Sequence, residues 1–184
     1  MSKNIFVFLF LFAISTIVDF PLIANATVYQ NLQKLDKYSF VMGRQIHGKK
    51  TGLTVSQSYD VCKIVMLKYN QKLARGNAKR GFKSFLHYMS PAEVTYCWAG
   101  YVGTKSLSKL DEISYLMGKS LYGKNSGLST AQSYVGCEKA ALSYNKYLVS
   151  KVKNRNYGYF LTYAWPAEYT YCWVGYLDAA GANK

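Results

Sequence analysis

The strongest constraint on this chain is that its sequence repeats itself. A shift of 75 positions aligns residues 32–103 with residues 107–178 without a gap, and 32 of the 72 aligned positions are identical. The longest matching block, PAEVTYCWAGY at 91–101, recurs at 166–176 as PAEYTYCWVGY. Unrelated sequences do not match on this scale, so we predict a tandem duplication of one structural unit.

The repeat sets the expected domain boundaries. We expect copy 1 at residues 27–103, a linker at 104–106, copy 2 at 107–178 and a C-terminal tail at 179–184. A single copy of this length can bury only a marginal core. We therefore expect the two copies to pack face to face as a pseudo-twofold pair.

The first 26 residues have the pattern of a secretory signal peptide. Lys3 supplies a positive charge, residues 5–18 are apolar, and residues 24–26 form a small-x-small cleavage site. A retained membrane anchor is the alternative, but the apolar run is shorter than the roughly 18 residues that span a bilayer. We expect a secreted or periplasmic protein with no transmembrane segment after cleavage.

Apolar residues at steps of three and four predict a mainly α fold, with three helices in each copy. In copy 1 the first helix is expected at residues 31–46, where Gly43 indicates a close contact between helices. The second starts at a capping box formed by Thr54 and Gln57 and runs to about residue 74. Ser129 and Gln132 repeat this box in copy 2.

The third helix of copy 1 has a start signal in Ser90, Pro91 and Glu93: a cap residue, a proline at the first helical position and an acid at the third. The helix should end near Gly103. The aromatic stretch at 82–89, and its counterpart at 157–164, is compatible with either a helix or a strand.

Four cysteines occur, two per copy: Cys62 and Cys97, then Cys137 and Cys172. Disulfides are expected in an exported protein, and pairing within each copy lets both copies fold alike. Closing a loop of this length contributes roughly 4 kcal/mol in the chain-entropy model. Zinc sites use closer cysteine spacings, so we expect no metal and no cofactor.

The formal net charge is +14, and copy 1 carries most of it, with 12 basic and 3 acidic residues against 8 and 5 in copy 2. Such an excess attracts anionic polymers and surfaces. An anionic envelope polymer or a protein is the expected partner, and nucleic acid is less expected for an exported protein.

Basic residues mixed with aromatic residues in the expected loops are the candidate binding residues, because cations and rings together suit phosphate-bearing or sugar ligands. A solvated basic loop is the alternative. Trp165 occurs in copy 2 alone and is a candidate for contact with a partner. The full set is Lys49, Lys50, Arg75, Lys79, Arg80, Lys83, Lys151, Lys153, Arg155 and Trp165.

No catalytic constellation stands out. Glu93 and Glu168 are related by the repeat, and paired carboxylates about 5–9.5 Å apart hydrolyse glycosidic bonds. Glutamate at the third position of a helix also stabilises the helix start, and we favour this role. His47 and His87 have no counterpart in copy 2, and no nucleophile motif accompanies them. We expect a protein without enzymatic activity, with a cell-wall glycan hydrolase as an alternative.

Gly52, Leu53, Thr54 and Gln57, followed by an amphipathic helix, resemble a segment of the small, helical, disulfide-bonded periplasmic immunity proteins of the Tai type. The resemblance covers about 22 residues per copy. It implies an inhibitor or immunity-type protein that binds one protein partner. The main hypothesis remains an exported basic protein that contacts an anionic polymer or surface.

Overall fold

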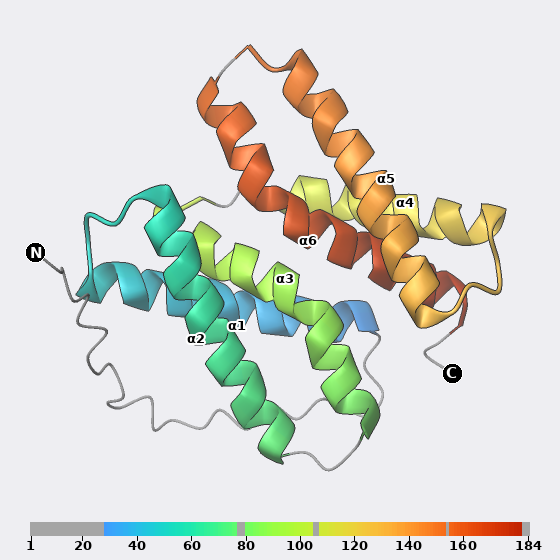
Figure 1. Cartoon of the computed structure of the whole chain (residues 1–184), viewed down its shortest axis with the longest axis horizontal. Coiled ribbons are helices and arrows are strands. Elements are labelled where there is room, and N and C mark those ends of the chain that lie inside the picture. The colour runs from blue at the N-terminus through green and yellow to red at the C-terminus, as the bar shows by residue number, and fades with distance from the viewer. Residues whose placement is uncertain (1–27, 77–79, 105–106, 154, 182–184) are drawn as a thin grey trace, which may run out of the picture.

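The computed structural model describes residues 28–76, 80–104, 107–153 and 155–181 of the chain (Figure 1). The predicted signal peptide lies outside these residues. The described part is mainly α, as expected, and none of its helices is long and apolar enough to cross a membrane. The helices are α1 (Val28–Lys49), α2 (Val55–Gly76), α3 (Arg80–Val102), α4 (Ser108–Lys124), α5 (Thr130–Lys151) and α6 (Arg155–Ala179).

The last helix of each group of three is the central one. In the N-terminal half, which we define as α1–α3, helix α3 packs against both α1 and α2. In the C-terminal half, α4–α6, helix α6 packs against both α4 and α5. The two halves lie side by side in Figure 1, and they meet mainly where α3 contacts α6, with a smaller contact between α1 and α6.

Helix α3 begins earlier than the sequence predicts. It starts at Arg80, so residues 82–89 are helical, and Pro91 lies inside the helix. The expected start at Ser90 is therefore wrong. Burial explains the difference, because the side chains of Leu86 and Met89 are fully or nearly fully buried only if the helix continues through this segment.

Helix α6 has the same organisation. It starts at Arg155, contains residues 157–164, and carries Pro166 in its interior. An interior proline removes one backbone hydrogen bond and usually bends a helix. Both α3 and α6 change direction part-way along their length in Figure 1.

The predicted capping boxes are present at the starts of α2 and α5. The Thr54 hydroxyl accepts a hydrogen bond from the Gln57 backbone N–H at 3.2 Å, and the Gln57 side chain accepts from the Thr54 N–H at 2.9 Å. Ser129 and Gln132 form the same reciprocal pair. These bonds satisfy backbone donors that the first turn of a helix leaves free.

A tyrosine of the central helix holds the loop that precedes each capping box. The Tyr101 hydroxyl donates to the Lys50 carbonyl at 3.0 Å and accepts from the Leu53 N–H at 3.1 Å. Tyr176 holds the loop between α4 and α5 in the same way, with distances of 2.9 and 3.0 Å. The path of both loops is therefore set by the central helices.

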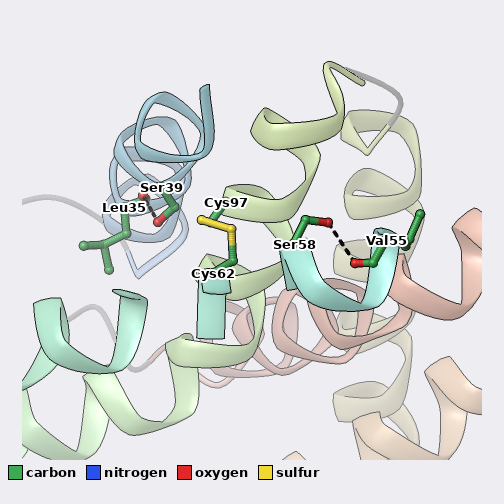
Figure 2. The surroundings of a disulfide bond; sticks show 6 residues. All are labelled: Leu35, Ser39, Val55, Ser58, Cys62 and Cys97. Atoms are coloured by element: carbon green, nitrogen blue, oxygen red, sulfur yellow. Dashed lines mark hydrogen bonds between the residues drawn. A yellow bond between two sulfur atoms is a disulfide. The ribbon is translucent and has the colours of Figure 1, made fainter. Parts of the chain in front are cut away.

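Two buried disulfides tie the second helix of each half to the third. Figure 2 shows the bond from Cys62 of α2 to Cys97 of α3. Cys137 of α5 is bonded to Cys172 of α6, and each bond closes the same sequence separation of 35 residues. The pairing is the one predicted from the sequence, with each bond inside one half.

Glycines bring the backbones of the first and third helices into direct contact. A Cβ on Gly43 of α1 would lie 1.8 Å from the carbonyl oxygen of Cys97, and one on Gly100 of α3 would lie 2.0 Å from that of Phe40. Gly118 repeats the contact between α4 and α6. The close approach predicted at Gly43 is confirmed.

Candidate functional site

Four carboxyl groups lie in the interior of the protein. The exposed fractions are 2% for Asp36, 0% for Glu93, 3% for Asp111 and 1% for Glu168. Burying an ionised carboxyl away from water is costly unless it is paired or protonated. The groups around each of these four carboxyls therefore determine whether it is ionised and which role it can have.

The two aspartates link the halves in a reciprocal way. Asp36 of α1 accepts a hydrogen bond of 2.6 Å from the Tyr171 hydroxyl of α6. Asp111 of α4 accepts a hydrogen bond from the Tyr96 hydroxyl of α3. The two tyrosine rings lie 6.5 Å apart. Each half thus contributes one aspartate acceptor and one tyrosine donor to the hydrogen bonds that join the halves.

The two glutamates act within their own halves. Glu93 accepts a hydrogen bond from the Asn70 side chain of α2, and Glu168 accepts one from Asn145 of α5 at 3.1 Å. The expected role at a helix start is wrong, because each glutamate lies well inside its helix. A carboxyl with almost no exposed surface is also out of reach of an external glycan, so these residues join the second and third helices.

Burial raises the pKa of all four carboxyls. Burial raises the pKa of Glu93 to about 7, although the hydrogen bond from Asn70 lowers it in part. Burial likewise raises the pKa of Glu168 and of Asp111 to about 7. Burial raises the pKa of Asp36 well above its usual range, although the hydrogen bond from Tyr171 lowers it in part, and the nearby Asp111 and Glu93 raise it further. A large fraction of these groups is therefore protonated near neutral pH.

These shifts predict a protein that is more stable in mild acid. The unfolded carboxyls titrate near about pH 4, so between there and about pH 7 the folded state binds more protons than the unfolded state. The stabilisation is complete below about pH 4 and is lost as the pH rises through about 7. We expect the melting temperature to rise by several degrees from pH 8 to pH 5. A Glu93→Gln, Glu168→Gln variant should show a flatter profile in a calorimetric pH series; an unchanged profile would assign the effect to other groups.

Aromatic rings also cross between the halves. Tyr163 of α6 stacks on Trp98 of α3 at 5.2 Å and contacts Tyr59 of α2 at 5.1 Å. The equivalent cluster brings Tyr88 of α3 within 4.9 Å of Trp173 of α6. Both tryptophans are only 3% exposed. They are core residues.

Burial of acids leaves the surface of the N-terminal half almost entirely basic. Residues 27–103 contain three acids, and two of them, Asp36 and Glu93, are in the interior. Asp60 is the one with an exposed side chain. The described cations that face solvent are Lys34, which is half-buried, and the exposed Lys37, Arg44, Lys49, Lys50, Lys63, Lys68, Lys72, Arg75 and Lys83.

Helix α2 carries four of these cations, spread around its solvent-exposed half. We define the basic face as Lys63, Lys68, Lys72 and Arg75, all exposed. The equivalent positions of α5 hold Glu138, Ser143, Tyr147 and Ser150. The fold therefore does not require cations at these positions, since α5 forms the same kind of helix without them.

The predicted binding residues are only partly brought together. Their cations and neighbouring rings lie on or beside helices, because α2 runs to Gly76 and α3 resumes at Arg80. Lys79 and the side chains of Arg80 and Arg155 lie outside the described part of the chain. Exposed side chains are found at Lys49, Lys50, Arg75, Lys83, Lys151 and Lys153. Of these, Arg75 belongs to the basic face.

The sequence alone does not single out Lys63, Lys68 and Lys72, because exposed lysines are ordinary on the outer side of an amphipathic helix. Comparison of the two copies would have found them. Each of the three is replaced by an acidic or uncharged residue at the matching position of copy 2.

Trp165 is half-buried on α6 and packs edge-on against Tyr169 at 5.1 Å. Its indole N–H is buried and has no hydrogen-bond partner among the described residues. A partner could therefore reach only part of the ring, and the donor itself is turned away from solvent.

The histidines form no cluster with other ligands. His47 lies 5.0 Å from the Tyr101 ring, and His87 lies 5.4 Å from the Tyr88 ring. Within the described ranges, no group of three or more His, Cys, Asp or Glu side chains is arranged to hold a metal ion.

Comparison of the chain with known protein families, curated proteins and solved structures finds no match.

Proposed function

We propose that this chain is an exported, non-enzymatic protein that binds an anionic polymer through the basic face of its N-terminal half. One observation carries the proposal. Two of the three acids of residues 27–103 are buried, so the surface of that half presents many cations and one exposed carboxylate, Asp60.

The buried acids also do little to oppose an anionic ligand. While Glu93 and Asp36 are protonated, they carry no negative charge, and the field around the N-terminal half is more positive than the formal count. Cations spaced along one helix suit a ligand that carries many charges, because each neutralised pair releases a counterion. A small anion would engage only one or two of them.

The fold in this proposal is a duplicated three-helix unit, with the two copies packed as a pseudo-twofold pair. The sequence identity at a shift of 75 positions supports it. The hydrogen bonds between the halves support it as well. Tyr96 binds Asp111 and Tyr171 binds Asp36, and the shift of 75 positions relates the two tyrosines to each other and the two aspartates to each other. Duplication would have freed one copy to change its surface while the shared contacts kept the fold.

Export is part of the proposal. The signal-like sequence at residues 1–26 supports a secreted or periplasmic location. Two disulfides support it as well, because such bonds persist in oxidising compartments. An anionic envelope polymer would be within reach there.

The experiment is a binding titration with dextran sulfate as the probe polymer, repeated at several salt concentrations. If about four charges are neutralised, the affinity should fall about a hundredfold between 50 and 200 mM salt. Binding that does not change with salt, or no binding of any polyanion, would contradict the proposal.

A further inference from the structure

Exposed tyrosines gather where α5 ends and α6 begins, in the C-terminal half. The exposed fractions are 57% for Tyr147, 41% for Tyr157 and 53% for Tyr159. Rings of this size are mostly buried in a small protein, so a group of three in one region requires an explanation.

The rings continue into a ladder that crosses from α6 to the N-terminal half. Tyr157 stacks with Phe160 at 5.9 Å, and Phe160 stacks with Trp98 of α3 at 5.8 Å. Trp98 stacks with Tyr163 at 5.2 Å, and Tyr163 meets Tyr159 at 5.2 Å. We call these five residues the tyrosine ladder, after its three tyrosines; they are Trp98, Tyr157, Tyr159, Phe160 and Tyr163. Its inner rings are fixed by the core, so its outer rings stand on a rigid base.

Cations lie beside the outer end of the ladder. The Lys151 ammonium sits over the Tyr147 ring at 5.7 Å from its centre, and Lys153 is exposed just beyond α5. Tyr144 lies within electrostatic range of Tyr147 and of Tyr157, a residue of the ladder. Its pKa is raised by burial and then by Glu168, Tyr147 and Tyr157, so the last two rings both lie near it.

The inner end of the ladder reaches the start of α2. Tyr163 contacts Tyr59 at 5.1 Å. The pKa of Tyr163 is raised by its hydrogen bond with Tyr159, by burial and by Asp60, while a bond with Ser56 lowers it. Lys63, the first residue of the basic face, lies one turn further along α2 from Asp60. The inner end of the ladder therefore lies close to Lys63, the residue with which the basic face begins.

The fold does not need the outer rings. Lys72 stands at the position equivalent to Tyr147, and Ser84 at the position equivalent to Tyr159. Both occupy the same places in α2 and α3 that the tyrosines occupy in α5 and α6. Among the described side chains, the exposed tyrosines thus lie in the C-terminal half, whereas a lysine and a serine stand at two of the matching positions in the N-terminal half.

We propose that the tyrosine ladder and Tyr147 bind sugar rings, so that the ligand of the nearby basic face is an anionic polysaccharide. This inference rests on the proposed function. A tyrosine ring offers an apolar face to the C–H groups of a sugar and a hydroxyl to its polar edge. A ring-free polyanion would use the cations and leave the tyrosines unused.

An anionic lipid surface is the competing occupant, since Ile64 and Leu67 are also exposed beside the basic face, at 50% and 54%. The ladder favours the polysaccharide, because its exposed rings carry hydroxyl groups that can bond to a sugar. Ile64 and Leu67 form a patch of only two aliphatic side chains, and an exposed patch this small is normal on a monomeric protein.

The test compares three probes on the full exported protein: dextran sulfate, polyphosphate and vesicles of phosphatidylglycerol. Replacement of two of the exposed rings, Tyr147→Ser with Tyr159→Ser, should lower the affinity for dextran sulfate about thirtyfold, at about 1 kcal/mol per lost ring contact. The affinity for polyphosphate should stay the same. Tyr147→Phe with Tyr159→Phe, which keeps the rings, should retain most of the affinity for dextran sulfate.

Leu116→Ser is the matched control, because Leu116 is 55% exposed on α4, outside the ladder. It should leave all three probes unaffected. Equal losses for dextran sulfate and polyphosphate, no loss for either, or binding of vesicles alone would overturn the polysaccharide assignment. In the first two cases the proposed polyanion binding survives. Failure to bind any polyanion would overturn both proposals.

Discussion

Replacing Gly43 with alanine is expected to destroy the packing of α1 on α3. The new methyl group would lie 1.8 Å from the Cys97 carbonyl oxygen, and the opposing atom belongs to a helix backbone that cannot turn aside. The helices would have to separate along the whole contact. We expect a loss of at least about 3–5 kcal/mol, out of a total stability of about 5–15 kcal/mol for a domain. Chemical denaturation followed by circular dichroism measures it.

Gly48→Ala supplies the control within the same helix. Nothing lies within 4 Å of a Cβ at Gly48, which is exposed in the last turn of α1. Alanine there should be neutral or stabilise the helix by up to about 1 kcal/mol. Equal stability of the Gly43→Ala and Gly48→Ala proteins would show that α1 and α3 do not touch through their backbones.

Removal of either disulfide should have the second largest effect. The double replacement Cys62→Ser, Cys97→Ser reopens a loop of 35 residues and should cost about 4 kcal/mol in the chain-entropy model. Cys137→Ser with Cys172→Ser should cost a similar amount, because the closed loop has the same length. The midpoint of urea unfolding for each variant provides the comparison.

Loss of one disulfide should weaken the whole protein, because the contacts that join the halves are exchanged between them. Asp36 depends on Tyr171, and Trp98 depends on Tyr163. We expect a single unfolding transition in each variant, followed equally by probes in both halves. Two separate transitions, with the intact half surviving alone, would refute this coupling.

The parts of the fold that follow from local signals could be predicted from the sequence. Hydrogen bonds between neighbours in the chain set the starts of α2 and α5, so the capping residues Thr54 and Ser129 were sufficient to locate them. Pairing of Cys62 with Cys97 followed from the symmetry of the two copies. The close contact at Gly43 followed from a glycine inside a helical pattern.

The start of α3 could not be predicted, because distant packing decides it. Ser90 and Pro91 form a good local start signal, yet the helix continues for ten residues before Ser90, to Arg80. Leu86 and Met89 gain their burial in a core cluster that includes Val174 of α6. No feature within copy 1 alone indicates that contact.

The binding surface was only partly predictable for a related reason. The sequence shows the excess of basic residues, but the charge of the surface also depends on whether the few acidic residues are exposed or buried. Asp36 and Glu93 look like ordinary helix residues, and only their tertiary contacts remove them from the surface. The tyrosine ladder likewise joins residues of α3 and α6 that are far apart in the sequence.

The measurement that tests the account most directly exchanges the basic face for the residues that copy 2 carries at the same positions. The variant Lys63→Glu, Lys68→Ser, Lys72→Tyr, Arg75→Ser lowers the net charge by five. Its new residues are the ones that α5 carries at the equivalent positions. Its control neutralises five exposed lysines of the C-terminal half, Lys109, Lys119, Lys124, Lys139 and Lys146, to glutamine. With dextran sulfate at constant salt, we predict a loss of about a hundredfold for the first protein and a much smaller loss for the second. Equal losses would show that only total charge matters and would contradict a binding surface on α2.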